Sequence, residues 1–252
     1  MAKQRGILRL KGTLDGITFY KSKDGYMVRT KGSIDRSRIA SDPAFQRTRE
    51  NNAEFGNAGK AGKLIRTAFR TALLSAADKR LASRLTKEML RVVRTDTVNP
   101  RGQRMASAGD LLLIKQFDFN INAKLGTTFF APYVPVVDRA TGSLGVSIAP
   151  FTPLHMVVAP SGTTHFQLLS GGAEIDFDNG LHVSAMSNSE ILPYSSADTE
   201  LLELNSSVTA ASALPLMLVF GIAFFQEVNG QMYALKNGVH NALNLVEIIP
   251  AP

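Results

Sequence analysis

The sequence contains no cysteine among its 252 residues, so disulfides, thiolate metal sites and cysteine nucleophiles are excluded. Long apolar runs are also missing. The longest covers residues 214–225, which is 12 residues, whereas a membrane-spanning helix needs about 20. We therefore expect no membrane span and interpret this run as a buried strand or hairpin arm. The first residues carry no apolar core of about 7–15 residues, so no secretory signal is expected. These absences predict synthesis in the cytoplasm, with release only through lysis or a dedicated exporter.

Positive charge is nearly absent from the second half of the chain. No lysine or arginine occurs between Arg139 and Lys236. Residues 1–104 carry 24 basic and 9 acidic groups, a net of +15, and residues 105–252 carry 4 and 12, a net of −8, which together give +7. A chain divided in this way either offers its basic half to a polyanion or has halves that attract each other between subunits.

The composition that is present is typical of a globular protein, with 44% hydrophobic and 19% charged residues. Three compositional segments follow one another along the chain. We predict a basic N-terminal β-hairpin arm over residues 1–40, a basic helical region over 41–110 and an acidic all-β domain over 111–252. The expected fold class is α+β, in which the hairpin and helical arm precede an antiparallel β-sandwich.

The N-terminal segment contains a hairpin signal. Two short β-prone runs, residues 16–20 and 26–30, flank the sequence of residues 21–25, Lys-Ser-Lys-Asp-Gly. The Asp-Gly pair supplies the positive-φ position of a hairpin turn. Because an isolated two-stranded hairpin is marginal in water, we expect it to dock on its own domain or on a neighbouring subunit.

Helical signals dominate residues 41–95. Asp42 can cap a helix whose first turn contains Pro43, and this helix is expected to end where Gly56 and Gly59 loosen it. Apolar residues at helical spacing predict two further helices, over residues 58–76 and 78–94. Their apolar stripes differ in phase by about 130°, which favours two helices joined by a tight turn.

Both of these later helices carry a basic face. On the second helix, three cations lie together, namely Lys63, Arg66 and Arg70. On the third, five cations recur at intervals of 4, 3, 4 and 3 residues: Arg80, Arg84, Lys87, Arg91 and Arg94. Such a stripe can follow a phosphate backbone, bind an acidic protein surface or remain solvated. Few base-reading side chains accompany it, so any nucleic acid would be bound through its backbone.

The C-terminal segment is expected to be all β. Its β-prone runs are separated by turn signals, of which Asn-Gly at residues 179–180, 229–230 and 237–238 is the strongest type. About eight to ten strands at this spacing predict a sandwich. Residues 216–225 do not alternate in polarity, so we expect that strand to be covered on both faces.

One predicted strand face is acidic. Glu174, Asp176 and Asp178 alternate along it, and His182 lies just beyond the following turn. These groups could bind a divalent cation, but they lack the order of a calcium loop. We interpret them as a solvent-facing acidic surface that serves as the partner of the basic helices, with a metal site as the lesser alternative.

No catalytic motif is found. The glycine-rich residues 56–63 lack the spacing and the Ser or Thr of a phosphate-binding loop. Neither Ser161 nor Ser170 lies in a Gly-x-Ser-x-Gly elbow, and no histidine precedes His155. We therefore expect no enzymatic activity, no catalytic residues, no cofactor and no metal.

Two resemblances are carried by the N-terminal residues. These are Lys11-Gly12-Thr13, the run of residues 15–20, Gly25-Tyr26-Met27-Val28-Arg29, Asp42-Pro43-Ala44-Phe45 and residues 47–51. With residues 225–233, they are similar to an uncharacterised family from Bacteroidetes-type bacteria, which implies no activity. The N-terminal part also loosely resembles segments of prophage-associated structural proteins, in which a glycine-rich hairpin precedes an Asn/Asp-Pro and an Arg-bearing helix. That resemblance implies a virion or tube-like context.

The sequence therefore predicts a non-enzymatic structural protein that self-assembles head to tail into a filament, tube or shell. Its basic arm would contact the acidic β-domain of the next copy. The alternative is a nucleic-acid-binding protein, related to packaging or to a virion, that uses the basic helical stripe. A carbohydrate-binding or adhesive β-domain is a third hypothesis, against which the absence of tryptophan and of a signal counts.

Overall fold

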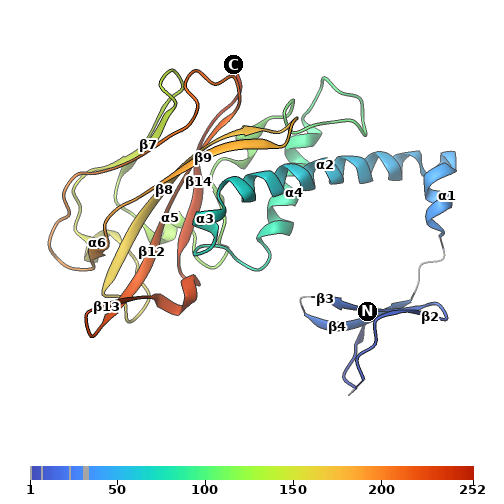
Figure 1. Cartoon of the computed structure of the whole chain (residues 1–252), viewed down its shortest axis with the longest axis horizontal. Helices are drawn as coiled ribbons and strands as arrows, with labels where there is room; N and C mark the ends of the chain where they lie inside the picture. The colour runs from blue at the N-terminus through green and yellow to red at the C-terminus, as the bar shows by residue number, and fades with distance from the viewer. Residues whose placement is uncertain (1, 7, 23, 31–33) are drawn as a thin grey trace. The chain divides into compact units, whose positions relative to one another are not determined.

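The computed structural model describes residues 2–6, 8–22, 24–30 and 34–252. The chain forms two compact units, residues 1–51 and residues 52–252 (Figure 1). The fold is α+β, as expected: an N-terminal β-sheet and helices precede a set of antiparallel sheets.

The first unit is built on a four-stranded antiparallel sheet with the strand order β1-β4-β3-β2. Its strands are β1 (Ala2–Lys3), β2 (Gly12–Leu14), β3 (Ile17–Ser22) and β4 (Gly25–Thr30). The predicted hairpin is β3–β4, and Gly25 takes a φ of +111° at its turn. Lys23 of this predicted turn lies outside the described residues. A further hairpin, β2–β3, was not predicted; its turn places Asp15 at φ 41° and Gly16 at φ 79°.

None of the described residues of the first unit is buried. Several large apolar side chains are exposed there, including Leu8 at 82% and Leu14 at 69%. A sheet of this size usually needs a covered hydrophobic face for independent stability. The first unit therefore has a fold but no core.

The chain then turns into helices. Asp35 caps α1 (Arg36–Ser41), and Asp42 accepts a hydrogen bond of 2.9 Å from the Ala44 amide at the start of a 3₁₀ turn, Pro43–Phe45. Helix α2 (Gln46–Ala68) follows directly. The expected loosening at Gly56 and Gly59 is wrong, because α2 runs without a break through both. An extended helix tolerates single glycines at a cost of about 1 kcal/mol each relative to alanine.

Two more helices complete the helical layer of the second unit. They are α3 (Arg70–Leu73) and α4 (Leu81–Arg94). The predicted separation of two helices is confirmed, but their predicted bounds are wrong: the helix expected over 58–76 is interrupted at Phe69, and residues 74–80 connect α3 to α4. Asp78 organises this connection by accepting the Arg80 amide at 2.6 Å. Gly62 lies where α2 approaches α4, since a Cβ there would be 3.5 Å from Leu85.

Two antiparallel sheets form the rest of the second unit. The larger has seven strands in the order β10-β8-β12-β14-β5, with β9 paired to β8 and β13 to β12; the smaller has the order β11-β7-β6. The strands are β5 (Phe117–Asp118), β6 (Tyr133–Asp138), β7 (Ser143–Ile148), β8 (His165–Asp176), β9 (Leu181–Asn188), β10 (Leu192–Pro193), β11 (Leu202–Ser207), β12 (Leu216–Val228), β13 (Gln231–Ala234) and β14 (Ala242–Ile249). These ten described strands fall within the expected number. A short helical turn, η2 (Leu111–Ile114), precedes β5, and three others lie between strands: α5 (Leu125–Thr128), α6 (Pro153–Met156) and η3 (Leu235–Gly238).

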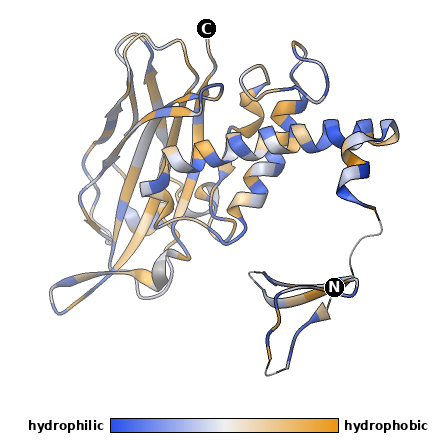
Figure 2. Cartoon of the chain, turned by 45° about the vertical axis from the view of Figure 1, so that its right-hand side comes forward, coloured by the Kyte–Doolittle hydropathy of each residue, from blue (hydrophilic) through white to orange (hydrophobic). Residues whose placement is uncertain are grey.

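The central strand β12 is covered on both faces, as predicted. Met217 and Val219 belong to the core under the helices, whereas Leu218 and Phe220 belong to the core between the two sheets. Figure 2 shows hydrophobic residues concentrated along the long strands of the larger sheet. The second unit thus has three layers, in which the larger sheet separates the helices from the smaller sheet.

Each core is packed with large side chains. The helix-facing core joins Ile65, Phe69, Leu85 and Met89 to residues of β8, β12 and β14. In the other core, the ring of Phe129 meets the rings of Phe151 and Phe220, each at 5.4 Å between centroids. Full burial of one such side chain contributes about 1.5–3 kcal/mol. The second unit is therefore expected to be stable without a partner.

Candidate interaction surfaces

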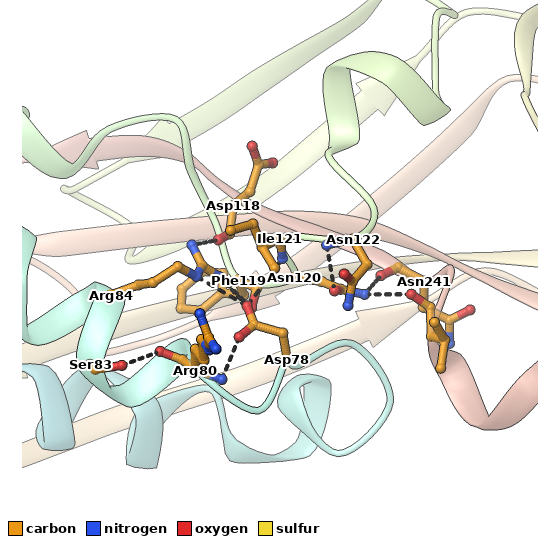
Figure 3. Close-up of polar contacts among 11 residues, drawn as sticks. Asp78, Arg80, Ser83, Arg84, Asp118, Phe119, Asn120, Ile121, Asn122 and Asn241 are labelled. Carbon is orange, nitrogen blue, oxygen red and sulfur yellow. Dashed lines mark hydrogen bonds and ion pairs between the residues drawn. The ribbon is translucent and has the colours of Figure 1, made fainter. Parts of the chain in front are cut away.

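The predicted cationic stripe of α4 does not present five free cations. Its second member, Arg84, points toward the sheet and donates hydrogen bonds to the carbonyl oxygens of Asp118, at 2.9 Å, and Phe119, at 3.1 Å. It also forms an ion pair with Asp78, whose side chain is 4% exposed (Figure 3). The guanidinium carbon lies 5.0 Å from the centre of the Phe117 ring. Arg84 therefore fixes α4 to β5 rather than serving a partner.

The Asp78 carboxylate is the acidic partner in this ion pair. Burial opposes its ionisation, but hydrogen bonds from the Arg84 side chain and from the amides of Ile121 and Arg80 outweigh burial and lower its pKa. The Ile121 amide donates at 3.1 Å and the Arg80 amide at 2.6 Å. Asp78 is consequently a charged structural group at neutral pH and not a proton donor.

The remaining members of the stripe lie on the exposed side of α4. Arg91 pairs with Glu88 at 2.7 Å. Arg80, Lys87 and Arg94 are exposed, and no carboxylate of the described residues forms an ion pair with them. The stripe thus divides into one locked, one paired and three available cations.

The basic face predicted on the second helix is also uneven. Lys63 lies on α2 and Arg70 on α3, and both are exposed. Arg66 is half-buried and donates to the Gly62 carbonyl of its own helix at 3.2 Å. These residues form a solvated edge of the helical layer, with only two cations free to contact a partner.

The predicted acidic face is only partly presented to solvent, since Asp178 is exposed and Glu174 is not. Glu174 is buried, 7% exposed, because the even-numbered positions of β8 face the smaller sheet. Its Oε2 atom has no hydrogen-bond partner among the described residues. The expectation that Glu174 belongs to a solvent-facing surface is therefore wrong. Strand alternation alone could not reveal this, because it does not show that a second sheet covers the polar face.

Asp176 and Asp178 serve the turn after β8 instead. Asp176 accepts hydrogen bonds from the Asn179 amide at 2.9 Å and the Asn179 side chain at 2.7 Å, which lower its pKa. Asp178 accepts from the Ser107 hydroxyl at 2.6 Å. The three predicted acids do not form one surface. Over the part of the chain that is described, no three His, Asp or Glu side chains are grouped as metal ligands.

A hollow of about 540 Å³ lies beside the Asp78–Arg84 pair. Leu74, Ile121 and Val239 line it and are each at least half exposed, at 80%, 52% and 50%. Its ionisable lining comprises Asp78 and two cations, Lys79 and Arg80. The Ser75 hydroxyl donates to the Ala72 carbonyl at 3.0 Å, so it is not oriented by a base. The carboxylate of this lining, Asp78, is already engaged by Arg84 and by the amides of Arg80 and Ile121.

The outer face of the smaller sheet is an exposed surface of the second unit. The register places small residues of β7 in its centre, Ser143, Gly145 and Ser147. On β6 it carries Val134, 63% exposed, and Val136, 47% exposed. Its charged groups are Asp138 and Glu203, and hydrogen bonds from the Thr141 hydroxyl and the Ala140 amide lower the pKa of Asp138. This face is acidic and partly apolar, and sequence reasoning missed it.

The two faces of the N-terminal sheet differ in polarity. Residues paired across antiparallel strands point to the same face. The register therefore groups five apolar side chains, Ala2, Leu14, Ile17, Phe19 and Val28, which we call the apolar face. Lys21, Tyr26 and Thr30 lie on the same side of the sheet. The opposite face carries Thr13, Thr18, Tyr20, Met27 and Arg29. No member of the apolar face is buried within its own unit, and Ala2, Leu14 and Ile17 are exposed.

The division of charge follows the two units more closely than the two halves of the sequence. Residues 1–51 contain 12 basic and 5 acidic groups, a net of +7. Residues 52–252 contain 16 of each, a net of zero. The net charge of the chain, +7, therefore comes entirely from the first unit, which has no core.

Among the described residues, no helix combines the length and hydrophobicity needed to cross a membrane.

Comparison with known proteins identifies no family for this chain. No family model and no curated protein matches it. A solved structure from a study of the pH-induced modulation of Streptococcus parasanguinis adhesion by Fap1 fimbriae matches 45% of this chain and 78% of its own. The identity is 11% and the TM-score 0.22, a likeness that carries no argument about fold or function.

Proposed function

We propose that this protein is a non-enzymatic structural subunit that self-assembles head to tail into a filament, tube or shell. The observation that supports this most directly is the apolar face of the N-terminal sheet. Its unit contains no buried residue among those described, so the sheet lacks the covered face that such structures need in water. Docking on another copy would supply that cover.

The apolar face is large enough to supply useful binding energy. Leu14 and Ile17 are 69% and 41% exposed, and Phe19 and Val28 are half-buried beside them. Complete burial of one such side chain contributes about 1.5–3 kcal/mol. Several together offset part of the cost of association and of ordering the unit.

The partner that we propose for it is the outer face of the smaller sheet on the next copy. That face combines exposed Val134 and Val136 with the carboxylates of Asp138 and Glu203, and its residues include no lysine or arginine. The N-terminal unit has a net charge of +7, so charge would orient the encounter while apolar contact stabilises the complex.

A contact between two different surfaces is heterologous. It repeats from copy to copy, and it ends only if the rotation between copies closes a ring. Assembly of this kind needs no enzymatic site, no cofactor and no partner other than the protein itself.

The test uses two neighbouring residues of β2 that point to opposite faces. Leu14→Asp places a charge on the apolar face, and Thr13→Asp makes a similar charge change on the other face. We expect electron microscopy and sedimentation velocity to show assemblies for the wild type and for Thr13→Asp, and smaller species for Leu14→Asp. A wild-type protein that stays monomeric at every salt and at high protein concentration would rule out the proposal.

The receiving surface is tested separately. Val136 on β6 and Val183 on β9 are both 47% exposed, so lysine substitutions at the two positions are matched in accessibility. Val136→Lys should reduce assembly because it adds positive charge where the cationic unit docks, whereas Val183→Lys should leave assembly unchanged. Equal effects of the two substitutions would show that the smaller sheet is not the receiving surface.

A further inference from the structure

A cationic hollow lies on the N-terminal sheet, beside the turn between β3 and β4. It measures about 380 Å³, and its basic lining residues are Lys3, Arg5, Arg9 and Lys21. The Tyr26 ring also lines it. We infer that this hollow binds a chain of closely spaced phosphate groups, such as a nucleic-acid backbone or inorganic polyphosphate. This inference does not rest on self-assembly, although Lys21 and Tyr26 lie on the same side of the sheet as Phe19 and Val28 of the apolar face.

The hollow is held in shape by Gln4. Its backbone amide donates to the Tyr26 carbonyl at 2.8 Å, which ties it to β4. Its side-chain amide donates to the carbonyl oxygens of Met27, at 3.1 Å, and Leu10, at 3.3 Å, and accepts the Leu10 amide at 3.0 Å. One side chain therefore closes the loop that carries Arg5 and Arg9 against the sheet.

Tyr26 positions two of the four cations. The Arg9 guanidinium carbon lies 5.2 Å from the centre of its ring, and the Lys21 Nζ atom lies 5.8 Å from it. Cation–π contacts at these distances are worth about 0.5–1 kcal/mol at exposed sites. They keep both cations at the hollow instead of dispersed in solvent.

The charges of the hollow are not neutralised within the unit. No ion pair joins Lys3, Arg5, Arg9 or Lys21 to a carboxylate of the described residues. Asp24 is the acidic group among the lining residues, which leaves a net of three positive charges, four minus one. Like charges held together without a counter-charge are unfavourable, and an anionic ligand removes that repulsion.

Phosphate fits this arrangement better than protein carboxylates do. A phosphate chain carries a charge on every unit, and the planar guanidinium of arginine can donate two parallel hydrogen bonds to one phosphate. The acids on the outer face of the smaller sheet, Asp138 and Glu203, lie on different strands of it. The hollow also offers more unpaired cations than the α4 stripe, where Arg84 is locked and Arg91 is paired.

Binding is expected to be independent of base sequence. Two cations already occupy the neighbourhood of the Tyr26 ring, so base stacking on it is disfavoured. Contacts to phosphates carry no direct sequence information. Affinity should therefore depend on salt and on the number of phosphates rather than on base composition.

The experiment measures fluorescence anisotropy of a labelled oligothymidylate of about 20 nucleotides with the full chain over a series of salt concentrations. The hollow variant is the double substitution Arg5→Glu and Arg9→Glu. The matched control is Lys87→Glu and Arg94→Glu, which makes the same charge change on α4. We expect the hollow variant to lose about tenfold or more in affinity, and to lower the salt slope by about 1.4, because each single-strand phosphate contact contributes about 0.7.

Competition distinguishes the sources of phosphate. Inorganic tripolyphosphate should displace the oligonucleotide if the hollow recognises phosphates themselves; failure to displace it, with binding intact, assigns the site to nucleic acid. Both results support a phosphate-chain site. Poly-glutamate that competes as well as tripolyphosphate would overturn it in favour of a general acidic partner.

Two further results would also overturn the inference: no binding by the wild type at low salt, or equal losses in the hollow and α4 variants. Arg5→Lys with Arg9→Lys should retain most of the affinity, and thermal unfolding should be unchanged, since both arginines are exposed. Leu14→Asp should bind the oligonucleotide within about threefold of wild type, because it adds a single negative charge outside the hollow. Loss of self-assembly alone can therefore be told apart from loss of this site.

Discussion

The two compact units of this protein differ in how their apolar and charged groups are used. Residues 52–252 bury apolar side chains in two cores and contain equal numbers of acidic and basic groups. Residues 1–51 bury no described side chain and carry the whole net charge of +7. The apolar cores of the described residues therefore belong to the second unit, whereas the first unit exposes apolar and cationic side chains.

One arginine from each unit shows the same contrast, although other arginines of the first unit, Arg38 and Arg47, form ion pairs. In the second unit Arg84 is held by Asp78 and by two backbone carbonyl oxygens, and this side chain is 23% exposed. In the first unit Arg9 rests on the Tyr26 ring, with no carboxylate of the described residues paired to it. The same residue type therefore stabilises the fold in one place and remains available in the other.

The largest effect is expected when one aromatic side chain is removed from each unit. Phe220→Ala should lower the free energy of unfolding of the second unit by about 3–5 kcal/mol, because Phe220 is fully buried between the two sheets. Phe19→Ala should leave that transition within about 0.5 kcal/mol of wild type, since Phe19 lies outside both cores. Urea denaturation monitored by circular dichroism measures both. Similar losses in the two variants would show that the units unfold as one.

The next effect concerns the two arginines. Arg84→Ala should lower the free energy of unfolding of the second unit by about 3 kcal/mol, because it leaves the buried Asp78 carboxylate without its cationic partner. Arg9→Ala should leave the free energy of unfolding of the second unit within about 0.5 kcal/mol of wild type, because Arg9 belongs to the first unit. Arg84→Lys, which keeps the charge but loses the paired donors, should lie between wild type and Arg84→Ala.

The loss of stability caused by Arg84→Ala should also depend on pH, and the pKa of Asp78 determines its direction. The folded-state pKa of Asp78 is lowered, so its contribution to stability is present above its unfolded value of 3.8 and is lost as the pH falls through the folded value. The difference between wild type and Arg84→Ala should therefore narrow below pH 3.8. Urea titrations at successive pH values test this, and a constant difference down to low pH would contradict the role given to Asp78.

Local signals in the sequence predicted much of the fold. The non-alternating run of β12 indicated a strand covered on both faces, and Met217 and Leu218 do face different cores. Asn229 and Gly230 both take positive φ, 52° and 75°, in the hairpin turn that their identity predicts. Such features depend on a few neighbouring residues, so periodicity and turn chemistry suffice to predict them.

The surfaces could not be predicted in the same way. Helical spacing placed Arg84 on the stripe, but only the position of β5 beside α4 shows that its guanidinium is held by Asp118 and Phe119. Strand alternation placed Glu174 on a polar face that the smaller sheet covers. Charge counted along the sequence likewise grouped the helices with the N-terminal unit, although those helices share a core with the larger sheet. Each error reflects a contact between residues distant in sequence.

The smallest expected change in stability concerns α2, because the sequence predicted a break at Gly56 and Gly59 that the structure does not contain. A Cβ at Gly56 or Gly59 of α2 would meet no atom within 4 Å. Alanine at each position should therefore stabilise the second unit by about 0.5–1 kcal/mol, because glycine loses more backbone entropy in a helix than alanine does. Gly109→Ala is the matched control: its Cβ would lie 2.3 Å from the Val92 carbonyl oxygen, so it should destabilise. Urea denaturation compares the three variants. If Gly56→Ala and Gly59→Ala were neutral or destabilising, the helix would not be continuous there, and the boundary between the two units would have to include a break in α2.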